Sequence, residues 1–133
     1  MRITADTNVL VRAITGDDED QARAAQAELA RAELVALTLP TLCELAWVLG
    51  KGYRHSHAEI ASVIRRLIGS RNVRIDRPAA ECGWANLEAG GDFADGVIAY
   101  EGRWLGANMF VSFDSQAVRL MEAQGGAART PRN

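Results

Sequence analysis

The chain has 133 residues, of which 48% are hydrophobic and 24% are charged, and its formal net charge is -2. This composition is ordinary for a soluble globular protein, and the length suits one domain that buries its own core. The slight acidity excludes the strongly basic surface of a dedicated nucleic-acid binder.

The two cysteines, Cys43 and Cys82, are far apart in the chain and belong to no CxxC motif. Both fall in helical stretches, which favours buried free thiols over a disulfide and fits a reducing compartment. The N-terminus lacks the long apolar segment of a signal peptide, and no apolar run approaches the ~20 residues that span a membrane. We therefore expect a cytoplasmic protein without membrane association.

The first predicted strand leads directly into an acid. The stretch from Arg2 to Val11 predicts a short strand with Asp6 at its C-terminal end, and then a helix over residues 8–14 that ends at Gly16. In a parallel α/β sheet, ligands bind outside the carboxyl ends of the strands. Asp6 is therefore better placed for a ligand than for packing.

Four consecutive acids, residues 17–20, precede the next predicted helix, which runs to about Arg31. A calcium-binding loop would need spaced ligands and a central glycine, and this run has neither. Acids in the first turn are stabilised by the positive end of the helix dipole, so a helix start explains the run better.

A continuous apolar run over residues 34–39 predicts a strand covered on both faces. Pro40 is expected to end this strand, and Thr41 to cap the helix that follows. Apolar residues at helical spacing predict that the helix ends near residues 50–52. Glu44 then lies one turn into the helix, just past a strand end.

The remaining elements are predicted from apolar spacing, glycines and prolines. His55 and His57 are expected in a loop and a helix cap rather than a metal site, because no acid lies beside them at metal-ligand spacing. The predicted elements are a helix from about Ser56 to Gly69, a strand at 72–75, a helix from Pro78 to about Glu88, a helix from Asp92 to Trp104, a strand at 109–113, a helix at 115–123 and a short edge strand in the tail.

Further acids occupy places comparable to that of Asp6. Asp92 and Asp95 lie on the first turn of one predicted helix, and Asp114 ends the last strong strand. Asp92 occupies the expected N-cap position, where losing a cap costs ~1 kcal/mol, so its structural explanation is stronger than that of Asp95, which the helix dipole favours in the first turn. Right-handed crossovers would bring these acids, Asp6 and Glu44 to one edge of a parallel sheet.

Clustered carboxylates of this kind predict a divalent cation. Like charges at close range raise one another's pKa, so three or four acids in one pocket need a counter-charge. Mg²⁺ or Mn²⁺ takes oxygen ligands, keeps several waters and can activate water against a phosphodiester. Thr7, Asn8 and Ser112 are expected to orient the carboxylates as auxiliary residues.

Four segments, ADTNVL at 5–10, LCEL at 42–45, DFADGVIA at 92–99 and VSFD at 111–114, resemble motifs of the PIN domain. More narrowly, they resemble the VapC-type toxin ribonucleases of bacterial toxin–antitoxin pairs. The resemblance covers the whole chain and implies a single domain over residues 1–133. The implied fold is a three-layer α/β/α arrangement with a central, mainly parallel sheet of about four to five strands.

The resemblance also implies an activity and partners. The implied function is a metal-dependent endoribonuclease that binds Mg²⁺ or Mn²⁺, forms a homodimer and is inhibited by a cognate antitoxin protein. By motif position, the catalytic and metal-binding quartet is Asp6, Glu44, Asp95 and Asp114, with Asp92 as an auxiliary acid. Ser112 stands where the family often has Thr, and Gly96 stands where Ala is usual, which predicts a looser start of that helix.

Other functions fit the residues less well. A phosphatase of the haloacid dehalogenase type would need a second acid two residues after Asp6, where this chain has Asn8. A receiver domain would need a lysine at a late strand end, but the only lysine is Lys51, at a helix terminus. A catalytically inactive PIN-like interaction module remains the alternative function.

The RNA target is left open by the sequence. Transfer, ribosomal and messenger RNA all suit a pocket that holds phosphate through a metal. Trp84 is expected to pack against a helix rather than to stack on a base. Five arginines could contribute to an RNA-facing surface, namely Arg54, Arg65, Arg66, Arg71 and Arg74.

Overall fold

A computed structural model describes all residues from 1 to 133. The elements in chain order are β1 (Arg2–Thr4), α1 (Thr7–Thr15), α2 (Glu19–Arg31), β2 (Leu34–Ala36), α3 (Leu39–Trp47), the π-helical turn η1 (Val48–Gly52), α4 (His57–Ile68), β3 (Val73–Arg74), α5 (Arg77–Glu88), α6 (Phe93–Trp104), β4 (Phe110–Val111), α7 (Ser115–Ala123) and β5 (Ala128–Arg129). The predicted mixed α/β class with parallel strands is confirmed. None of the helices has the length and apolar character needed to cross a membrane.

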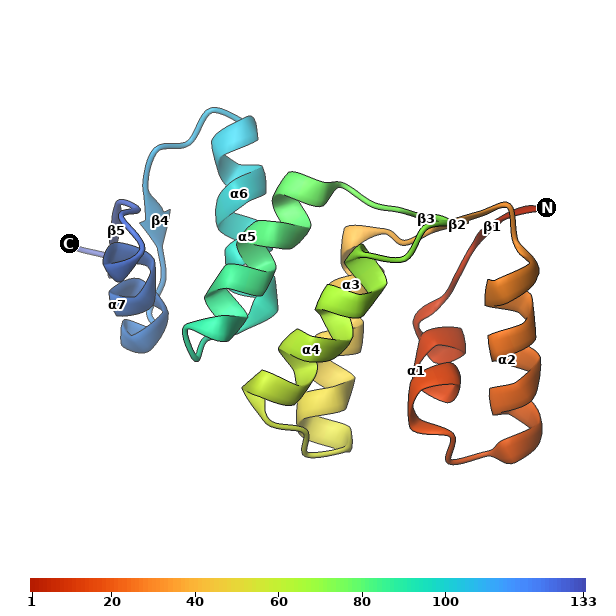
Figure 1. The fold of residues 1–133 in the computed structure, drawn as a ribbon. Helices are drawn as coiled ribbons and strands as arrows, with labels where there is room; N and C mark the ends of the chain where they lie inside the picture. Colours follow the sequence, from red (N-terminus) through yellow and green to blue (C-terminus); the bar gives the residue numbers. More distant parts are fainter.

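The five strands form two parallel sheets. One has the order β1-β2-β3, with Ile3 opposite Val35 and Val35 opposite Val73, and the other pairs β4 with β5. Figure 1 shows the two sheets at opposite ends of the molecule, with α3 to α6 between them. The number of strands agrees with the prediction, but the sequence predicted that they share one central sheet.

Most helix ends follow the predicted caps. Gly16 ends α1 in the left-handed conformation (φ 67°), which glycine adopts without a steric penalty. Ser56 and Glu59 form a reciprocal capping box at the start of α4. Asp18 caps α2 by accepting a hydrogen bond from the backbone N–H of Gln21, which confirms that the acidic run is a helix start.

Three predicted strands are shorter in the structure, and the strand predicted at 72–75 is reduced to β3. The run at 34–39 forms a paired strand only to Ala36, because Thr38 caps α3 and Leu39 already begins that helix. Pro40 lies in the first turn, where its missing N–H has no helical partner to lose. The prediction that Thr41 caps the helix was therefore wrong, since Thr41 is buried inside it. The strand predicted at 109–113 is confined to β4.

The buried residues fall into two clusters. The main cluster has 19 buried residues from β2, α1, η1, α3 to α6 and the segments directly after β1, α2 and β2, including Leu10, Leu45, Ile64 and Phe93. A second cluster of four, built on α6, α7 and β5, consists of Ala99, Val118, Met121 and Ala128. The C-terminal strands and α7 are thus packed separately from the main core.

Trp84 packs against the main cluster as predicted. Its indole N–H donates a 3.0 Å hydrogen bond to the carbonyl of Ala61, which joins α5 to α4. The Arg65 guanidinium lies 3.9 Å from the centre of the ring, a distance typical of a cation–π contact. One face of the Trp84 ring and its N–H group therefore both make contacts within the fold, and base stacking is not needed to explain this residue.

Helices α5 and α6 cross at Gly96. A Cβ atom there would lie 2.3 Å from the Cys82 carbonyl oxygen and 2.8 Å from the Cα of Gly83. Real Cβ atoms do not approach backbone this closely. Gly96 therefore has a packing role that the sequence did not predict, because its lack of a side chain permits close contact between the two helices.

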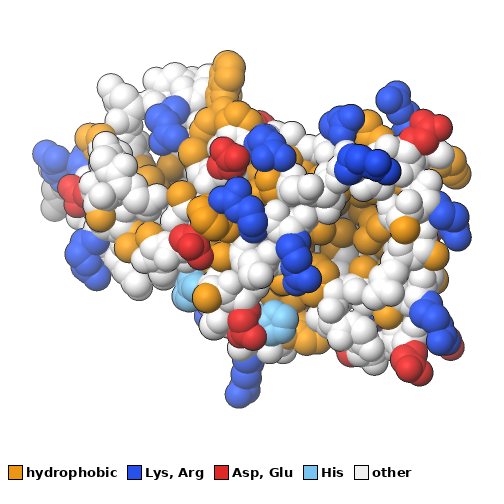
Figure 2. Space-filling view, viewed as in Figure 1, with side chains coloured by type: hydrophobic (Ala, Val, Ile, Leu, Met, Phe, Trp, Pro, Cys, Tyr) orange, Lys and Arg blue, Asp and Glu red, His pale blue; other side chains and the backbone are white.

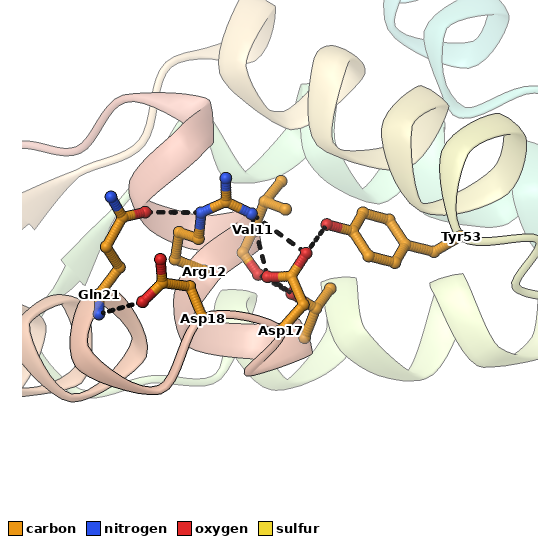
Figure 3. A network of polar contacts seen from close by, with 7 residues as sticks. Val11, Arg12, Asp17, Asp18, Gln21 and Tyr53 are labelled. Atoms are coloured by element: carbon orange, nitrogen blue, oxygen red, sulfur yellow. Dashed lines mark hydrogen bonds and ion pairs between the residues drawn. The ribbon is translucent and has the colours of Figure 1, made fainter.

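A polar network joins the α1–α2 turn to the loop after η1 (Figure 3). Asp17 accepts hydrogen bonds from Arg12 Nη1 at 2.9 Å and from the Tyr53 hydroxyl at 2.6 Å. The Nε of Arg12 also donates to the Gln21 side chain at 2.7 Å. The pKa of Asp17 is lowered, chiefly by the Tyr53 hydrogen bond. The network is exposed, so it positions these segments more than it stabilises the fold.

Candidate active site

Three predicted residues form a first group, which we call the N-terminal half-site: Asp6, Thr7 and Glu44. Asp6 follows β1 and accepts a 2.8 Å hydrogen bond from the backbone N–H of Thr7, so it caps α1. The Thr7 hydroxyl donates to Glu44 Oε1 at 2.9 Å. This contact joins the end of β1 to the first turns of α3 and places the Thr7 hydroxyl on the Glu44 carboxylate.

Three more acids form a second group, the C-terminal half-site: Asp92, Asp95 and Asp114. Asp92 and Asp95 lie on the first turn of α6, and Asp114 follows β4 and caps α7. The Asp114 carboxylate accepts hydrogen bonds from two backbone N–H groups of α7, at 3.0 and 3.1 Å. Ser112 accepts a 3.0 Å bond from the Asp114 N–H, so it supports the loop rather than the carboxylate itself.

Asp95 is the most perturbed of these acids. Its pKa is raised by partial burial and then by the negative charges of Asp92 and Asp114. Carboxylates with raised pKa values in a group of like charges are typical of functional sites. Asp95 is therefore where a bound cation would relieve the most unfavourable charge.

Asp92 does not have the structural role predicted for it. It occupies the N-cap position of α6, but its side chain makes no capping hydrogen bond. Only its backbone carbonyl is engaged, by the amide of the buried Asn86 at 2.7 Å. The Asp92 carboxylate is therefore not explained by helix capping. Asn8, the other auxiliary residue, is exposed and contacts none of the predicted acids through a hydrogen bond.

The two half-sites are not joined within this chain. Asp6 and Glu44 lie beside the three-stranded sheet, whereas Asp114 lies beside the sheet at the opposite end of the molecule (Figure 1). No three acidic, histidine or cysteine side chains converge closely enough to hold a metal ion. The oxygen donors suit Mg²⁺ or Mn²⁺, but their arrangement in a single chain does not fit one.

A cavity of about 230 Å³ lies between α3, η1 and α6, beside Asp92. His55, His57 and Lys51 line it together with Cys43 and Trp47. His55 has a buried ring nitrogen without a hydrogen-bond partner. The sequence predicts His55 in a loop and His57 at a helix cap; the structure has His55 in the loop before α4 and His57 as the first residue of that helix, after the cap Ser56. Their approach to α6 could not be found without the tertiary fold.

Both cysteines are free and partly buried, as predicted. The Cys43 pKa is raised to about 11, first by burial and then by the nearby charge of Glu101. A thiol with so high a pKa is protonated at neutral pH and is a poor nucleophile. The raised pKa therefore gives no support to Cys43 as a catalytic nucleophile.

The five arginines expected on an RNA-facing surface are all exposed. Arg65 is held against Trp84, and Arg74 donates to nearby backbone carbonyls. Figure 2 shows Lys and Arg side chains spread over the whole visible face rather than gathered into one patch. The basic surface alone therefore does not locate an RNA path.

Comparison with protein families places these observations in context. The PIN domain model matches residues 3–120, which is most of the chain and includes all four acidic motifs. Comparison with curated proteins and with solved structures gave no match. PIN domains are generally nucleases that act on RNA and use divalent metal ions. Since the match extends from β1 to α7, this chain belongs to the PIN domain family.

Proposed function

We propose that the protein is a metal-dependent endoribonuclease, and that it is the VapC-type toxin of a toxin–antitoxin pair. In this proposal, residues 1–133 form a single PIN domain that hydrolyses RNA phosphodiester bonds with Mg²⁺ or Mn²⁺. Asp6, Glu44, Asp95 and Asp114 hold the metal, and Asp92 is auxiliary. The observation that supports it most is the match of the PIN domain model over residues 3–120, a range that includes all four acidic motifs.

The chemistry of the acids supports the same proposal. Asp6 and Asp114 each follow a strand of a parallel sheet, the position at which α/β folds bind ligands. Thr7 holds Glu44 beside Asp6, and the pKa of Asp95 is raised by neighbouring carboxylates. Each half-site contains carboxylates without a basic partner, which are donors for a hard divalent cation rather than members of an ion pair.

The test is cleavage of a defined RNA by the purified protein with Mg²⁺, with Mn²⁺ and with a chelator. We expect cleavage that the chelator abolishes and that falls at least ~100-fold in Asp6→Asn and Asp114→Asn. Asn retains the capping function of both positions, so the loss is not attributable to unfolding. Asp20→Asn is the matched control, because Asp20 is an exposed acid of α2 outside the site. Unchanged cleavage in both site variants would refute the assignment, and no cleavage by any form would favour the inactive interaction module.

Asp95 is expected to matter more than Asp92. The proposal places Asp95 in the metal-binding quartet and Asp92 beside it. Asp92→Asn should therefore retain substantial cleavage, whereas Asp95→Asn should abolish it. Because neither side chain caps α6, both variants should fold alike, and a reversed ranking would mean that Asp92 belongs to the quartet.

The proposed antitoxin acts on the acidic site through a basic segment. Clustered carboxylates in a cleft create a strong local negative field, and an arginine can pair with two carboxylate oxygens at once. Adding the product of the neighbouring gene should suppress cleavage. Alanine in place of the arginines in its C-terminal tail should restore cleavage while the complex persists. Inhibition that survives those changes would indicate steric occlusion instead.

A further inference from the structure

The cavity between α3, η1 and α6 has an uneven distribution of charge. Its basic residues all come from one short segment, and we call them the basic wall: Lys51 of η1, His55 of the following loop and His57 at the start of α4. One acid, Asp92 of the α6 segment, also lines the cavity. None of the four acids of the proposed metal-binding quartet does. The cavity is therefore a separate place for a ligand.

His55 gives direct evidence that a polar partner is missing from this cavity. Its Nδ1 atom is buried and has no hydrogen-bond partner. Buried polar atoms in folded proteins nearly always have one. His55 lines the cavity, so a ligand bound there can supply the partner, as donor or acceptor according to the tautomer of the ring. Figure 2 shows histidine side chains, in pale blue, at the surface of the molecule.

The backbone of the segment that carries the basic wall has two unusual features. Lys51 belongs to the π-helical turn η1, and turns of this kind are frequent at functional sites. Arg54 has φ 57°, and it is the only residue other than glycine in the left-handed region. Strained conformations of this kind also cluster at binding and catalytic sites. The next residue, His55, is fixed by a 2.9 Å hydrogen bond from its N–H to the Leu49 carbonyl.

The rest of the lining suits a flat ring. Trp47 borders the cavity and is 66% exposed, and an exposed aromatic ring is a platform on which a nucleobase can stack. Buried apolar residues complete the lining, including Ile60, Leu87 and Phe93. The volume of about 230 Å³ is below the range of about 300–1,000 Å³ that drug-sized ligands occupy. The ligand is therefore small.

Asp92 limits the choice of ligand further. Its side chain makes no capping hydrogen bond, and an ionised carboxylate only accepts hydrogen bonds. A ligand that is anionic throughout would be repelled by it. The ligand that fits has a negative group for the basic wall, a flat ring for Trp47 and a hydrogen-bond donor for Asp92.

We propose that this cavity binds a nucleoside monophosphate. Lys51, His55 and His57 hold the phosphate, for which a lysine ammonium is a common partner. The base stacks on Trp47, and its exocyclic amino group donates to Asp92, as the N4 amino group of cytosine does to carboxylates. A free nucleotide and the phosphorylated end of an RNA present this same chemistry. The proposal does not depend on the proposed ribonuclease activity.

The first test is isothermal titration calorimetry of the full chain with cytidine 5′-monophosphate (CMP), with a chelator present so that no metal contributes. We expect saturable binding that weakens about tenfold or more in Lys51→Gln, which loses a charged hydrogen bond, and in Trp47→Leu, which loses the stacking surface. Both side chains are exposed, so both variants should keep the wild-type Tm. Arg71→Gln is the matched control, because it removes one exposed positive charge that does not line the cavity.

Related ligands test each part of the proposed contact. Cytidine, which lacks the phosphate, should bind more weakly and should be insensitive to Lys51→Gln. Uridine 5′-monophosphate has a carbonyl oxygen where cytosine has its amino group, so it should also bind more weakly than CMP. Equal affinity for the two nucleotides would overturn the placement of the base at Asp92.

A short cytidine RNA with a 5′-phosphate distinguishes the two sources of the ligand. Tighter binding of this RNA than of CMP, lost in Lys51→Gln and Trp47→Leu, would assign the cavity to RNA ends. Binding of CMP that is equal or tighter would assign it to free nucleotides. The proposal is overturned if neither ligand binds, or if both variants bind them as the wild type and Arg71→Gln do. Because the chelator prevents metal-dependent cleavage, these results do not depend on whether the chain is a ribonuclease.

Discussion

The contact between α5 and α6 predicts that Gly96→Ala destabilises the protein. The added methyl group would lie 2.3 Å from the Cys82 carbonyl oxygen, about 1 Å inside the ordinary contact distance of 3.4 Å or more. The obstacle is backbone, so the helices must move apart, and overpacking of this kind costs about 3 kcal/mol. The better helix propensity of alanine offsets about 1 kcal/mol of this loss in the free energy of unfolding. The net loss should be about 2 kcal/mol, or a decrease in Tm of about 5–10 °C.

Gly102→Ala is the matched control for this prediction. Gly102 lies on the same helix, and a Cβ atom there would have no neighbour within 4 Å. This variant should raise Tm slightly, since only the propensity gain remains. Thermal unfolding followed by circular dichroism compares the three proteins directly. A Gly96→Ala protein as stable as Gly102→Ala would refute the close crossing of α5 and α6.

Three other substitutions test the described contacts. Tyr53→Phe should move the Asp17 pKa up toward its ordinary value, because the Tyr53 hydroxyl is the main cause of its lowering. In the wild type, the stabilisation from this hydrogen bond is present above the ordinary carboxyl pKa and is lost as pH falls through the lowered pKa. An NMR titration of Asp17 in both proteins measures the difference. Asp95→Asn should raise Tm at neutral pH, because the raised pKa of Asp95 means that its charged form destabilises the folded protein. In the wild type this destabilisation is relieved as pH falls through the raised pKa. An unchanged or lower Tm of the variant at neutral pH would contradict this. Asn86→Ala should cost about 2 kcal/mol in denaturant unfolding, because it leaves the Asp92 carbonyl and the Gln124 amide without their partner.

Much of the local structure could be predicted from the sequence. Helix ends carry their signals in one or two neighbouring residues, such as the left-handed Gly16 or the Ser56 cap with Glu59. The strand at 34–39 was predicted too long because Thr38 combines extended backbone with a capping side chain. Apolar character continues through Leu39 into the helix, so hydrophobicity alone does not show the change of element.

The assembly of the site could be predicted only in part. The acids Asp6 and Asp114 follow strands as expected, and Thr7 contacts Glu44. The expectation that all four acids meet depends on every strand belonging to one sheet, and no local signal determines whether β4 pairs with β1. That choice depends on contacts far apart in the sequence, such as the one between Asn86 and Gln124. The close crossing at Gly96 could not be predicted from the sequence either, because a glycine within a helix can reflect packing, function or a helix end.

The π-helical turn at η1 affects how the chain tolerates insertions and deletions. In this turn the Tyr53 N–H bonds to the Val48 carbonyl, five residues back, so the turn holds one residue more than an α-helical turn. Removing one residue from 48–52 would restore ordinary α-helical spacing and rotate the following residues about the helix axis by about 100°. Tyr53 would then face away from Asp17. Homologous chains should therefore vary in sequence at η1 while keeping its length. A one-residue deletion there should break the Tyr53–Asp17 hydrogen bond, which joins the loop after η1 to the α1–α2 turn.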